Sequence, residues 1–336
     1  MYSIKKVDGY KPNMSLRDTQ KAIKLLKDTF EKSLATALNL ERVSAPMMVY
    51  AFSGINDDLS GHERPVRFDI KEIQGKEVEI VHSLAKWKRM ALGEYGFSKG
   101  QGLYTDMNAI RRDDELDNLH SIYVDQWDWE CIVDRNNRNI DFLKSIVKKI
   151  VDAIIKAQNT IKKHFSVISS AINKDIFFID SQKLLEMYPN LDAKQREFEI
   201  TKLKKTVFIL RIGDKLSNTE PHGARAPDYD DWQLNGDLII WSDTLCEPIE
   251  ISSMGIRVDS TSMQSQLKKA DKEYRTKFKF HQGVINDNLP LTIGGGIGQS
   301  RLCMLLLQKA HIGEVQASVW PEDMIEELKA QGIVLL

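Results

Sequence analysis

The chain has 336 residues, of which 42% are hydrophobic and 28% charged, and its 47 basic and 48 acidic residues leave a formal net charge of −1. This near-neutral balance argues against a surface built to bind transfer RNA or duplex nucleic acid. No run of about 18 apolar residues is present, and residues 1–13 lack the apolar centre of a secretory signal, so we expect neither a membrane span nor secretion. Cys131, Cys246 and Cys303 lie far apart without metal-ligand spacing, which favours free thiols in a cytoplasmic protein.

The predicted elements alternate between helices and strands along the chain. Residues 18–39 have the apolar spacing of an amphipathic helix, and the β-leaning runs 102–110 and 119–130, separated by a charged turn, predict an antiparallel pair. Further strand-like runs occupy 42–49 (interrupted by Pro46), 77–81, 206–212, 237–241, 247–258 and 291–298, and further helical patterns occupy 140–165, 260–280 and the residues from 299 onward. Without an internal repeat or a low-complexity linker, the pattern indicates an α+β domain built on an antiparallel sheet flanked by helices.

The segment 121–130, Ser-Ile-Tyr-Val-Asp-Gln-Trp-Asp-Trp-Glu, predicts a strand with two chemically different faces. Alternation places Gln126 and Asp128 on one face, and Trp127 and Trp129 on the other. Neighbouring polar groups of this kind can bind a substrate ammonium. Acidic residues that merely cover a solvated face are the alternative reading of the same pattern.

A glycine-rich run, residues 292–298, leads into a helix that carries Arg301. Glycines such as Gly295 and Gly296 let a backbone approach a nucleotide closely, and an arginine can pair with phosphate. The run lacks the Gly-Lys-Ser/Thr of a Walker loop, and it lies too near the carboxyl terminus for a Rossmann unit. A tight turn without a ligand stays open as an alternative.

Other polar residues are candidates for binding chemistry. Asp237 and Glu250, on neighbouring predicted strands, would suit Mg²⁺, which takes one or two carboxylates together with phosphate oxygens. Two unrelated surface acids are the alternative. Lys88 enters a helix after a strand, where a lone lysine is normally solvated, and Asp57 opens a turn-like segment, 57–61, whose acids by default serve only the turn.

The order of these features resembles the three signature motifs of class II aminoacyl-tRNA synthetases. Pro46 after a long helix resembles the first motif, Arg111 with Glu130 the second, and residues 294–301 the third. The aspartyl and asparaginyl group is the most similar type, because its run before the second motif also ends in a lysine, here Lys88.

The fuller match is to ammonia-dependent asparagine synthetases, the stand-alone relatives of that catalytic domain. The matching strings are 81–89 (Val-His-Ser-Leu-Ala-Lys-Trp-Lys-Arg), 123–130 (Tyr-Val-Asp-Gln-Trp-Asp-Trp-Glu), 225–232 (Arg-Ala-Pro-Asp-Tyr-Asp-Asp-Trp), 252–258 (Ser-Ser-Met-Gly-Ile-Arg-Val) and 292–302. The resemblance implies a single class II synthetase-like catalytic domain over residues 17–336 and an amino-terminal extension over residues 1–16. The segment 232–235 looks short for the family.

The resemblance also implies a reaction. The β-carboxylate of aspartate would attack the α-phosphate of ATP to give β-aspartyl-AMP and pyrophosphate, and ammonia would then displace AMP. Positioning and charge neutralisation would supply on the order of 10 kcal/mol. Arg111, on the α-phosphate, Arg301, on the outer phosphates, and Asp57, on substrate or ammonium, are the catalytic candidates. The aspartate-binding candidates are Asp57, Ser83, Lys88, Gln126, Asp128 and Arg257. The ATP-binding candidates are Arg111, Asp230, Asp237, Glu250, Ser253, Gly295, Gly296 and Arg301, with Asp237 and Glu250 holding Mg²⁺.

Free ammonia is the expected nitrogen donor, because Tyr2 stands where many glutamine-dependent enzymes carry a cysteine nucleophile. We expect small-molecule substrates, no nucleic-acid partner and, because class II domains pair through the first motif, a homodimer. One alternative is an aspartyl- or asparaginyl-tRNA synthetase, although only about 16 residues precede the first helix, too few for an anticodon-binding barrel. The other is a non-catalytic synthetase-like amino-acid-binding protein, which would be expected to lose phosphate or metal residues that are present here.

Overall fold

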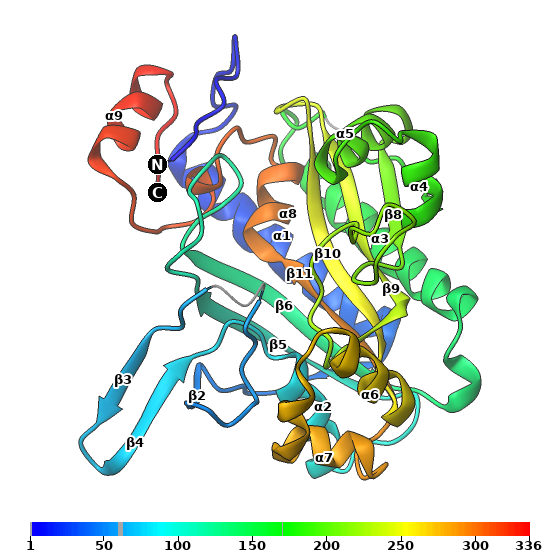
Figure 1. The fold of residues 1–336 in the computed structure, drawn as a ribbon. Helices are drawn as coiled ribbons and strands as arrows, with labels where there is room; N and C mark the ends of the chain where they lie inside the picture. Colours follow the sequence, from blue (N-terminus) through cyan, green and yellow to red (C-terminus); the bar gives the residue numbers. More distant parts are fainter. Residues whose placement is uncertain (1, 60–62, 170) are drawn as a thin grey trace.

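The computed structural model describes residues 2–59, 63–169 and 171–336, which fold around an eight-stranded sheet (Figure 1). Its central strands pair antiparallel, whereas β1 pairs parallel with β5 and β7 pairs parallel with β8 at the edges. In spatial order the strands are β1 (Leu40–Arg42), β5 (Gly102–Ile110), β6 (Tyr123–Ile132), β11 (Thr292–Gly298), β10 (Glu247–Arg257), β9 (Asp230–Ser242), β8 (Thr206–Leu210) and β7 (Phe177–Asp180). The predicted sheet flanked by helices is confirmed, with parallel strands added at both edges.

Two long helices, α1 (Leu16–Leu38) and α3 (Ile140–His164), pack against each other behind the sheet (Figure 1). Ser15 Oγ accepts a hydrogen bond from the first turn of α1, and Asn39, with φ 54°, ends the helix in the left-handed conformation. Asn139 caps α3 in the same way as Ser15 caps α1. The helices predicted over 18–39 and 140–165 are therefore confirmed, with boundaries set by these capping side chains.

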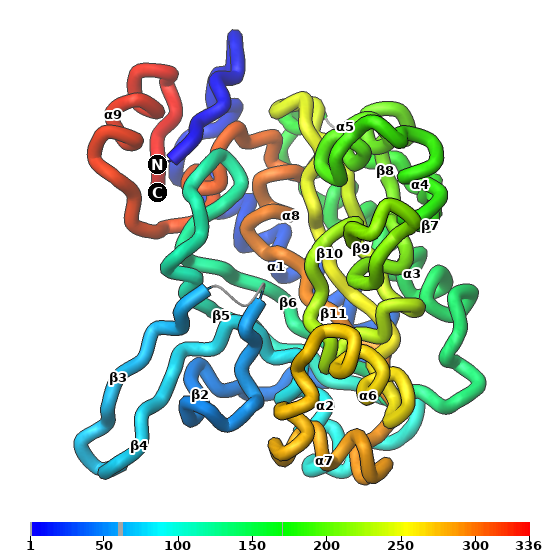
Figure 2. The backbone as a smooth tube through the Cα atoms, viewed as in Figure 1, coloured from blue at the N-terminus to red at the C-terminus, as the bar shows by residue number. Residues whose placement is uncertain are grey.

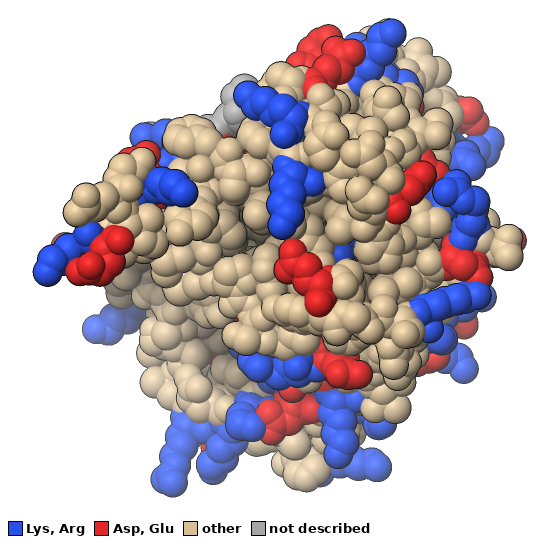
Figure 3. All heavy atoms as spheres, turned by 90° about the horizontal axis from the view of Figure 1, so that it is seen from below, with Lys and Arg blue, Asp and Glu red and all other residues tan. Residues whose placement is uncertain are grey.

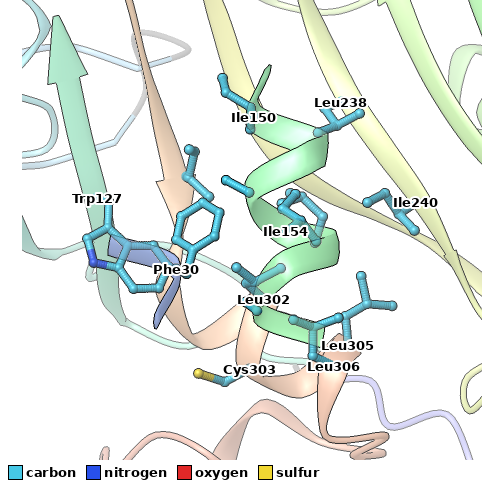
Figure 4. Packing of buried hydrophobic residues seen from close by; sticks show 14 of the residues in the cluster. Phe30, Trp127, Ile150, Ile154, Leu238, Ile240, Leu302, Cys303, Leu305 and Leu306 are labelled. Carbon is cyan, nitrogen blue, oxygen red and sulfur yellow. The ribbon is translucent and has the colours of Figure 1, made fainter. Parts of the chain in front are cut away.

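The main hydrophobic core lies between these helices and the sheet (Figure 4). Phe30 of α1 lies against Trp127 of β6, with ring centroids 4.7 Å apart, and Ile150 and Ile154 of α3 belong to the same buried cluster as Leu238 of β9. All five side chains are fully buried. Burial of each side chain of this size stabilises the folded state by roughly 1.5–3 kcal/mol. The indoles of β6 thus turn away from the opposite face of the sheet, where polar side chains gather.

The remaining elements surround the sheet. A separate small sheet, which projects from the body of the molecule in Figure 1, has the order β2 (Met48–Tyr50), β4 (Ile73–Ile80) and β3 (Arg67–Ile70). The other helices are α2 (Ala85–Glu94), α4 (Ser181–Met187), α5 (Ala193–Lys204), α6 (Ser260–Lys269), α7 (Lys279–Ile285), α8 (Gln299–Leu306) and α9 (Glu322–Ala330), with 3₁₀ turns η1 (Arg135–Asn137), η2 (Glu273–Lys277) and η3 (Ile312–Glu314). Within the described ranges, no helix is long and apolar enough to cross a membrane.

Two sequence predictions need correction. The strand-like run 42–49 is not one strand, because the chain leaves β1 at Arg42 and enters β2 only at Met48, with Pro46 in the connecting loop. The helical pattern 260–280 is broken after α6, where Asp271 adopts φ 53°, so α6, η2 and α7 are separate elements.

The first residues of the chain pack onto the body of the protein, beside α9 and the other terminus (Figures 1 and 2). Lys5 N donates to Asn118 Oδ1 at 2.7 Å, and Asn118 Nδ2 donates to Lys5 O at 3.1 Å. Tyr10 Oη donates to Glu314 Oε2 at 2.8 Å. The predicted amino-terminal extension is thus anchored to the loop that follows β5 and to the carboxyl-terminal region.

Candidate active site

Two adjoining cavities open over the polar face of the large sheet. The inner cavity is lined by all the predicted site residues except Asp237, namely Asp57, Ser83, Lys88, Arg111, Gln126, Asp128, Asp230, Glu250, Ser253, Arg257, Gly295, Gly296 and Arg301. The outer cavity shares Asp57, Arg111, Glu250 and Arg301 with the inner one and extends to the loop between β5 and β6. Residues that are far apart in the sequence therefore converge on one continuous space.

Strand β6 contributes its polar side chains to this space. Gln126 and Asp128 line the inner cavity, while Trp127 and Trp129 belong to the core, as alternation predicts. Lys88, fully buried on α2, forms an ion pair with Asp128 and donates to Trp129 O at 3.1 Å. Asp128 Oδ2 is buried without a hydrogen-bond partner in the described part of the chain, so this oxygen still has an open acceptor position.

Arg257 is the centre of a second buried charge cluster. Its Nε donates to Glu130 Oε1 at 2.9 Å and its Nη2 to Glu130 Oε2 at 2.7 Å, while Nη1 pairs with Asp230. Thr292 Oγ1 donates to Glu130 Oε1 at 2.7 Å. Burial alone would raise the pKa of Glu130, but the charge and hydrogen bonds of Arg257 outweigh burial and lower it. The carboxylate therefore stays ionised and fixes the guanidinium at the cavity wall.

The glycines of β11 leave room for side chains from β6. A Cβ atom at Gly294 would overlap with Glu130 Oε2, and one at Gly296 would overlap with Gln126 Oε1. Neither glycine has a positive φ. Close approach of neighbouring side chains, and not a strained turn, therefore explains the glycine-rich run, and the tight-turn alternative is wrong for this strand.

Two arginines that are far apart in the sequence reach the cavities. Arg111 directly follows β5, and its Nη2 donates weakly to His82 O at 3.4 Å, while its Nε is buried without a partner among the described residues. Arg301 lies in the first turn of α8, and its Nη1 donates to Glu250 O at 3.2 Å. Both guanidinium groups line both cavities and keep donors available for an anionic ligand.

Asp237 lies beside the cavities but does not line them. Its Oδ1 accepts a hydrogen bond at 2.6 Å from Nη2 of Arg225, which lines the outer cavity. Burial, with further help from the nearby charge of Glu250, raises the pKa of Asp237 to about 6. Two carboxylates on paired strands whose charges interact favour a cation between them, and together with phosphate oxygens they fit the ligand set of Mg²⁺. Within the described ranges, no cluster of three or more His, Cys, Asp or Glu side chains forms a metal site from protein groups alone.

Asp57 lies on a loop at the boundary of the two cavities. The buried carboxylate accepts hydrogen bonds from Tyr229 Oη at 3.0 Å and from Leu59 N at 3.2 Å. Its pKa is raised, chiefly by burial. The turn predicted over 57–61 lies only partly within the described residues, which end at residue 59 on this side of the gap.

The family model of aspartate–ammonia ligases matches residues 17–332 of the chain. The chain belongs to the aspartate–ammonia ligase family. An aspartate–ammonia ligase from Ruminiclostridium cellulolyticum is 55% identical to this member of the family over 336 residues, which cover 100% of both chains. Another from Clostridium perfringens strain 13 is 56% identical over 328 residues, 98% of each chain.

The fold of this ligase is shared with aminoacyl-tRNA synthetases. The asparaginyl-tRNA synthetase of Pyrococcus horikoshii, solved with asparaginyl-adenylate, aligns with a TM-score of 0.66 and 13% identity. The alignment covers 90% of the ligase and 70% of the synthetase. The predicted class II synthetase-like fold is therefore confirmed, as is the predicted relationship to asparagine synthetases.

Two residues at the site of the ligase received no role from the sequence. Tyr229 binds the Asp57 carboxylate, and Arg225 pairs with Asp237 and with Ser253. Both stand in the string 225–232, and the many aromatic and charged residues of this string could have indicated that it contributes to the site. The segment 232–235, which looks short for the family, lies inside strand β9.

Proposed function

We propose that this enzyme makes asparagine from aspartate, ammonia and ATP through a β-aspartyl-AMP intermediate. An oxygen of the aspartate β-carboxylate attacks the α-phosphorus of ATP, and the bond to pyrophosphate breaks. The nitrogen of ammonia then attacks the activated carbonyl carbon, and the carbon–oxygen bond to AMP breaks. The observation that supports this proposal most strongly is the convergence of Arg111 and Arg301 on the cavity that also holds Lys88, Asp128 and Arg257.

The inner cavity suits aspartate. Lys88 and Arg257 offer cationic groups for the two carboxylates of the substrate, and both are held rigidly by buried carboxylates. Gln126 and Asp128, whose Oδ2 has no partner among the described residues, accept hydrogen bonds from the α-ammonium. Ser83 adds a hydroxyl at the wall of the same cavity.

The triphosphate would lie along the arginines. Arg111 neutralises charge on the α-phosphate during attack, and Arg301 binds the outer phosphates, because a planar guanidinium binds phosphate oxygens in pairs. Asp237 and Glu250 would hold Mg²⁺, which would screen the phosphate charges. Asp230, Ser253, Gly295 and Gly296 complete the nucleotide site from β9, β10 and β11.

Asp57 would act in the second step, at the boundary between the cavities. A carboxylate there attracts ammonium, and a pKa raised by burial makes it a better proton acceptor than an exposed aspartate. The proton that the attacking nitrogen must lose then passes to Asp57, leaving neutral ammonia to form the amide.

The substitution Arg111→Ala tests the first step. We expect a loss of roughly 100- to 1000-fold in both asparagine formation and aspartate-dependent ATP–pyrophosphate exchange, because the α-phosphate loses its main counter-charge. The exposed Arg135 supplies a matched control, Arg135→Ala, which should keep both activities. Full exchange activity in Arg111→Ala would refute the role of Arg111.

Substrate tests separate the alternatives. Asparagine and AMP should form with ammonium and not with glutamine as donor, whereas transfer of aspartate or asparagine to transfer RNA would favour the synthetase alternative.

We propose that the enzyme binds no nucleic acid, which agrees with the interspersed basic and acidic side chains on the face in Figure 3. Free thiols at Cys131, Cys246 and Cys303 support a cytoplasmic location.

A further inference from the structure

Lys86 lies behind the inner cavity, on the same helix as Lys88. Its side chain is 3% exposed, and its ammonium group has three partners. Nζ donates to Gly54 O at 3.1 Å and to Asn56 O at 2.9 Å, and it forms an ion pair with Asp228 Oδ2 at 3.2 Å. Because a lysine has three N–H donors, each of them has a partner here.

The two carbonyl groups that Lys86 binds belong to the loop of residues 53–59, which we call the Asp57 loop. The second of them, that of Asn56, lies directly before Asp57. The amide group of Asn56 also links this loop to the end of β4 and to the second residue after it, because Nδ2 donates to Ile80 O at 3.2 Å and Oδ1 accepts from His82 N at 2.7 Å. Lys86 thus fixes the backbone just before the carboxylate that we assign to the ammonia step.

Asp228 anchors the other side of this arrangement. The fully buried Oδ2 also accepts hydrogen bonds from Arg275 Nη1 at 2.8 Å and from His281 Nε2 at 2.9 Å. Arg275 in turn pairs with the carboxylate of Asp58. Burial would raise the pKa of Asp228, but Lys86, His281 and Arg275 together hold it well below its ordinary value, so the carboxylate remains charged.

The loop also fits closely against Phe278, the residue that precedes α7 (Lys279–Ile285). Gly54 has φ 75°, and any Cβ atom there would overlap with the ring of Phe278, so this position requires glycine for both reasons. With Lys86 on one side, Phe278 on another and Arg275 on Asp58, the residues on both sides of Asp57 are restrained by elements distant in sequence.

We propose that Lys86 is a positioning residue that holds the Asp57 loop so that the Asp57 carboxylate faces the site of ammonia attack. The inference rests on the proposed role of Asp57 in the second step. Lys86 does not touch the substrates, because it lines neither cavity, whereas Lys88 lines the inner one; its ammonium group binds the loop and Asp228 instead.

The charge of Lys86 gives this role a measurable signature. Several titratable side chains surround Asp57. Lys86 approaches it from α2, Asp228 and Tyr229 from the segment before β9, and His82 from the segment after β4. Arg275 and His281 lie behind Asp228 and bind it. Burial raises the pKa of Asp57, Lys86 lowers it and Asp228 raises it. Loss of the lysine charge must therefore raise the pKa of Asp57 further. Since Asp57 accepts a proton only when ionised, the acid limb of the pH–rate profile of amide formation moves to higher pH.

The experiment compares Lys86→Met with Lys309→Met, which removes another buried lysine, three residues after α8. Aspartate-dependent ATP–pyrophosphate exchange, the KM for ammonium and the pH–rate profile of asparagine formation are measured for both variants, for Asp57→Asn and for the unsubstituted enzyme. In Lys86→Met we expect exchange within about twofold of the unsubstituted enzyme, and a loss of roughly 10- to 100-fold in kcat/KM for ammonium, because a displaced reacting group costs that much. The acid limb should move upward only in the Lys86 variant.

The outcomes separate the two proposals. If the unsubstituted enzyme forms no asparagine, the proposed function fails, and if Asp57→Asn keeps full ammonia-dependent activity, the role of Asp57 fails and the inference falls with it. With those two results as expected, an unchanged acid limb in Lys86→Met, or equal losses in exchange and amide formation, overturns the role of Lys86. Should Lys86→Met not fold, Lys86→Gln removes the charge while keeping a donor, and its acid limb must move in the same direction.

Discussion

The side chain of Gln126 determines which residue can stand at position 296. These two residues lie on neighbouring strands, and the amide of Gln126 occupies the volume that any side chain at position 296 would need. The glycine therefore affects the proposed substrate site through Gln126. Because Gln126 lines the inner cavity, a larger residue at position 296 would push this amide toward the position that we propose for aspartate.

The substitution Gly296→Ala measures this dependence. We expect the KM for aspartate to rise about tenfold and the free energy of unfolding to fall by about 1–3 kcal/mol, because overpacking forces a rotamer change in a filled site. Gly223→Ala is the matched control, since its Cβ would meet no atom closer than Ile212 Cγ2 at 3.5 Å. An unchanged KM for aspartate in Gly296→Ala would show that Gln126 moves without consequence and does not bind the substrate.

At the scale of elements, the loop between β5 and β6 depends on the amino-terminal segment. Asn118, only 4% exposed, exchanges hydrogen bonds with Lys5 and donates to Ala310 O at 2.8 Å. This loop begins at Arg111 and lines much of the outer cavity. The amino-terminal segment therefore supports the part of the chain that we expect to contact ATP.

Removing the Asn118 side chain should therefore affect nucleotide binding. In Asn118→Ala we expect the free energy of unfolding to fall by about 1–3 kcal/mol, because buried backbone partners are left unsatisfied, and the KM for ATP to rise. Ser15→Ala, which removes only the cap of α1 at a cost of about 1 kcal/mol, serves as the comparison of similar stability. Thermal unfolding gives the stability of both variants, and steady-state kinetics give their KM for ATP. An equal KM for ATP in both variants would contradict the proposal that Asn118 supports the nucleotide-binding loop.

Local sequence patterns were enough to predict most helices and strands, whereas the remaining features depend on contacts between residues distant in the sequence. The strand Gly102–Ile110 agrees with its prediction at both ends, because alternation and a following charged turn are local signals. The alternation of β6 likewise predicts which side chains face the cavity. By contrast, the pairing of Asp237 with Arg225 joins residues 12 positions apart through a loop without periodic pattern. The break in the helical run 260–280 arises at Asp271, whose left-handed conformation no composition signal indicates.

Across the whole molecule, the small sheet presents an unusual amount of apolar surface. Phe52 is 70% exposed, and Met47, Met48, Tyr50 and Phe68 are exposed on the same sheet or next to it. Pro46, which resembles the first motif, stands directly beside them. Exposed apolar clusters mark interaction surfaces, so we propose that two copies of the chain pair here as a homodimer.

The double substitution Phe52→Ser with Phe68→Ser tests this pairing. Sedimentation equilibrium should give twice the mass of one chain for the unsubstituted enzyme and the mass of one chain for the variant, because the apolar contact area is lost. Tyr274→Ser, at another exposed aromatic residue, should leave the mass unchanged. A single-chain mass for the unsubstituted enzyme would contradict the pairing.

The alternation along β6 also constrains how this gene can change in length. Inserting or deleting one residue between Gln126 and Glu130 would exchange the two faces of the strand beyond that point. Tryptophan side chains would then point toward the cavity, and carboxylates would point into the hydrophobic core. Such an insertion or deletion would impair both catalysis and folding, and one further substitution would not correct the altered alternation. Length polymorphism is therefore expected at connecting turns, while this decapeptide keeps a constant codon count.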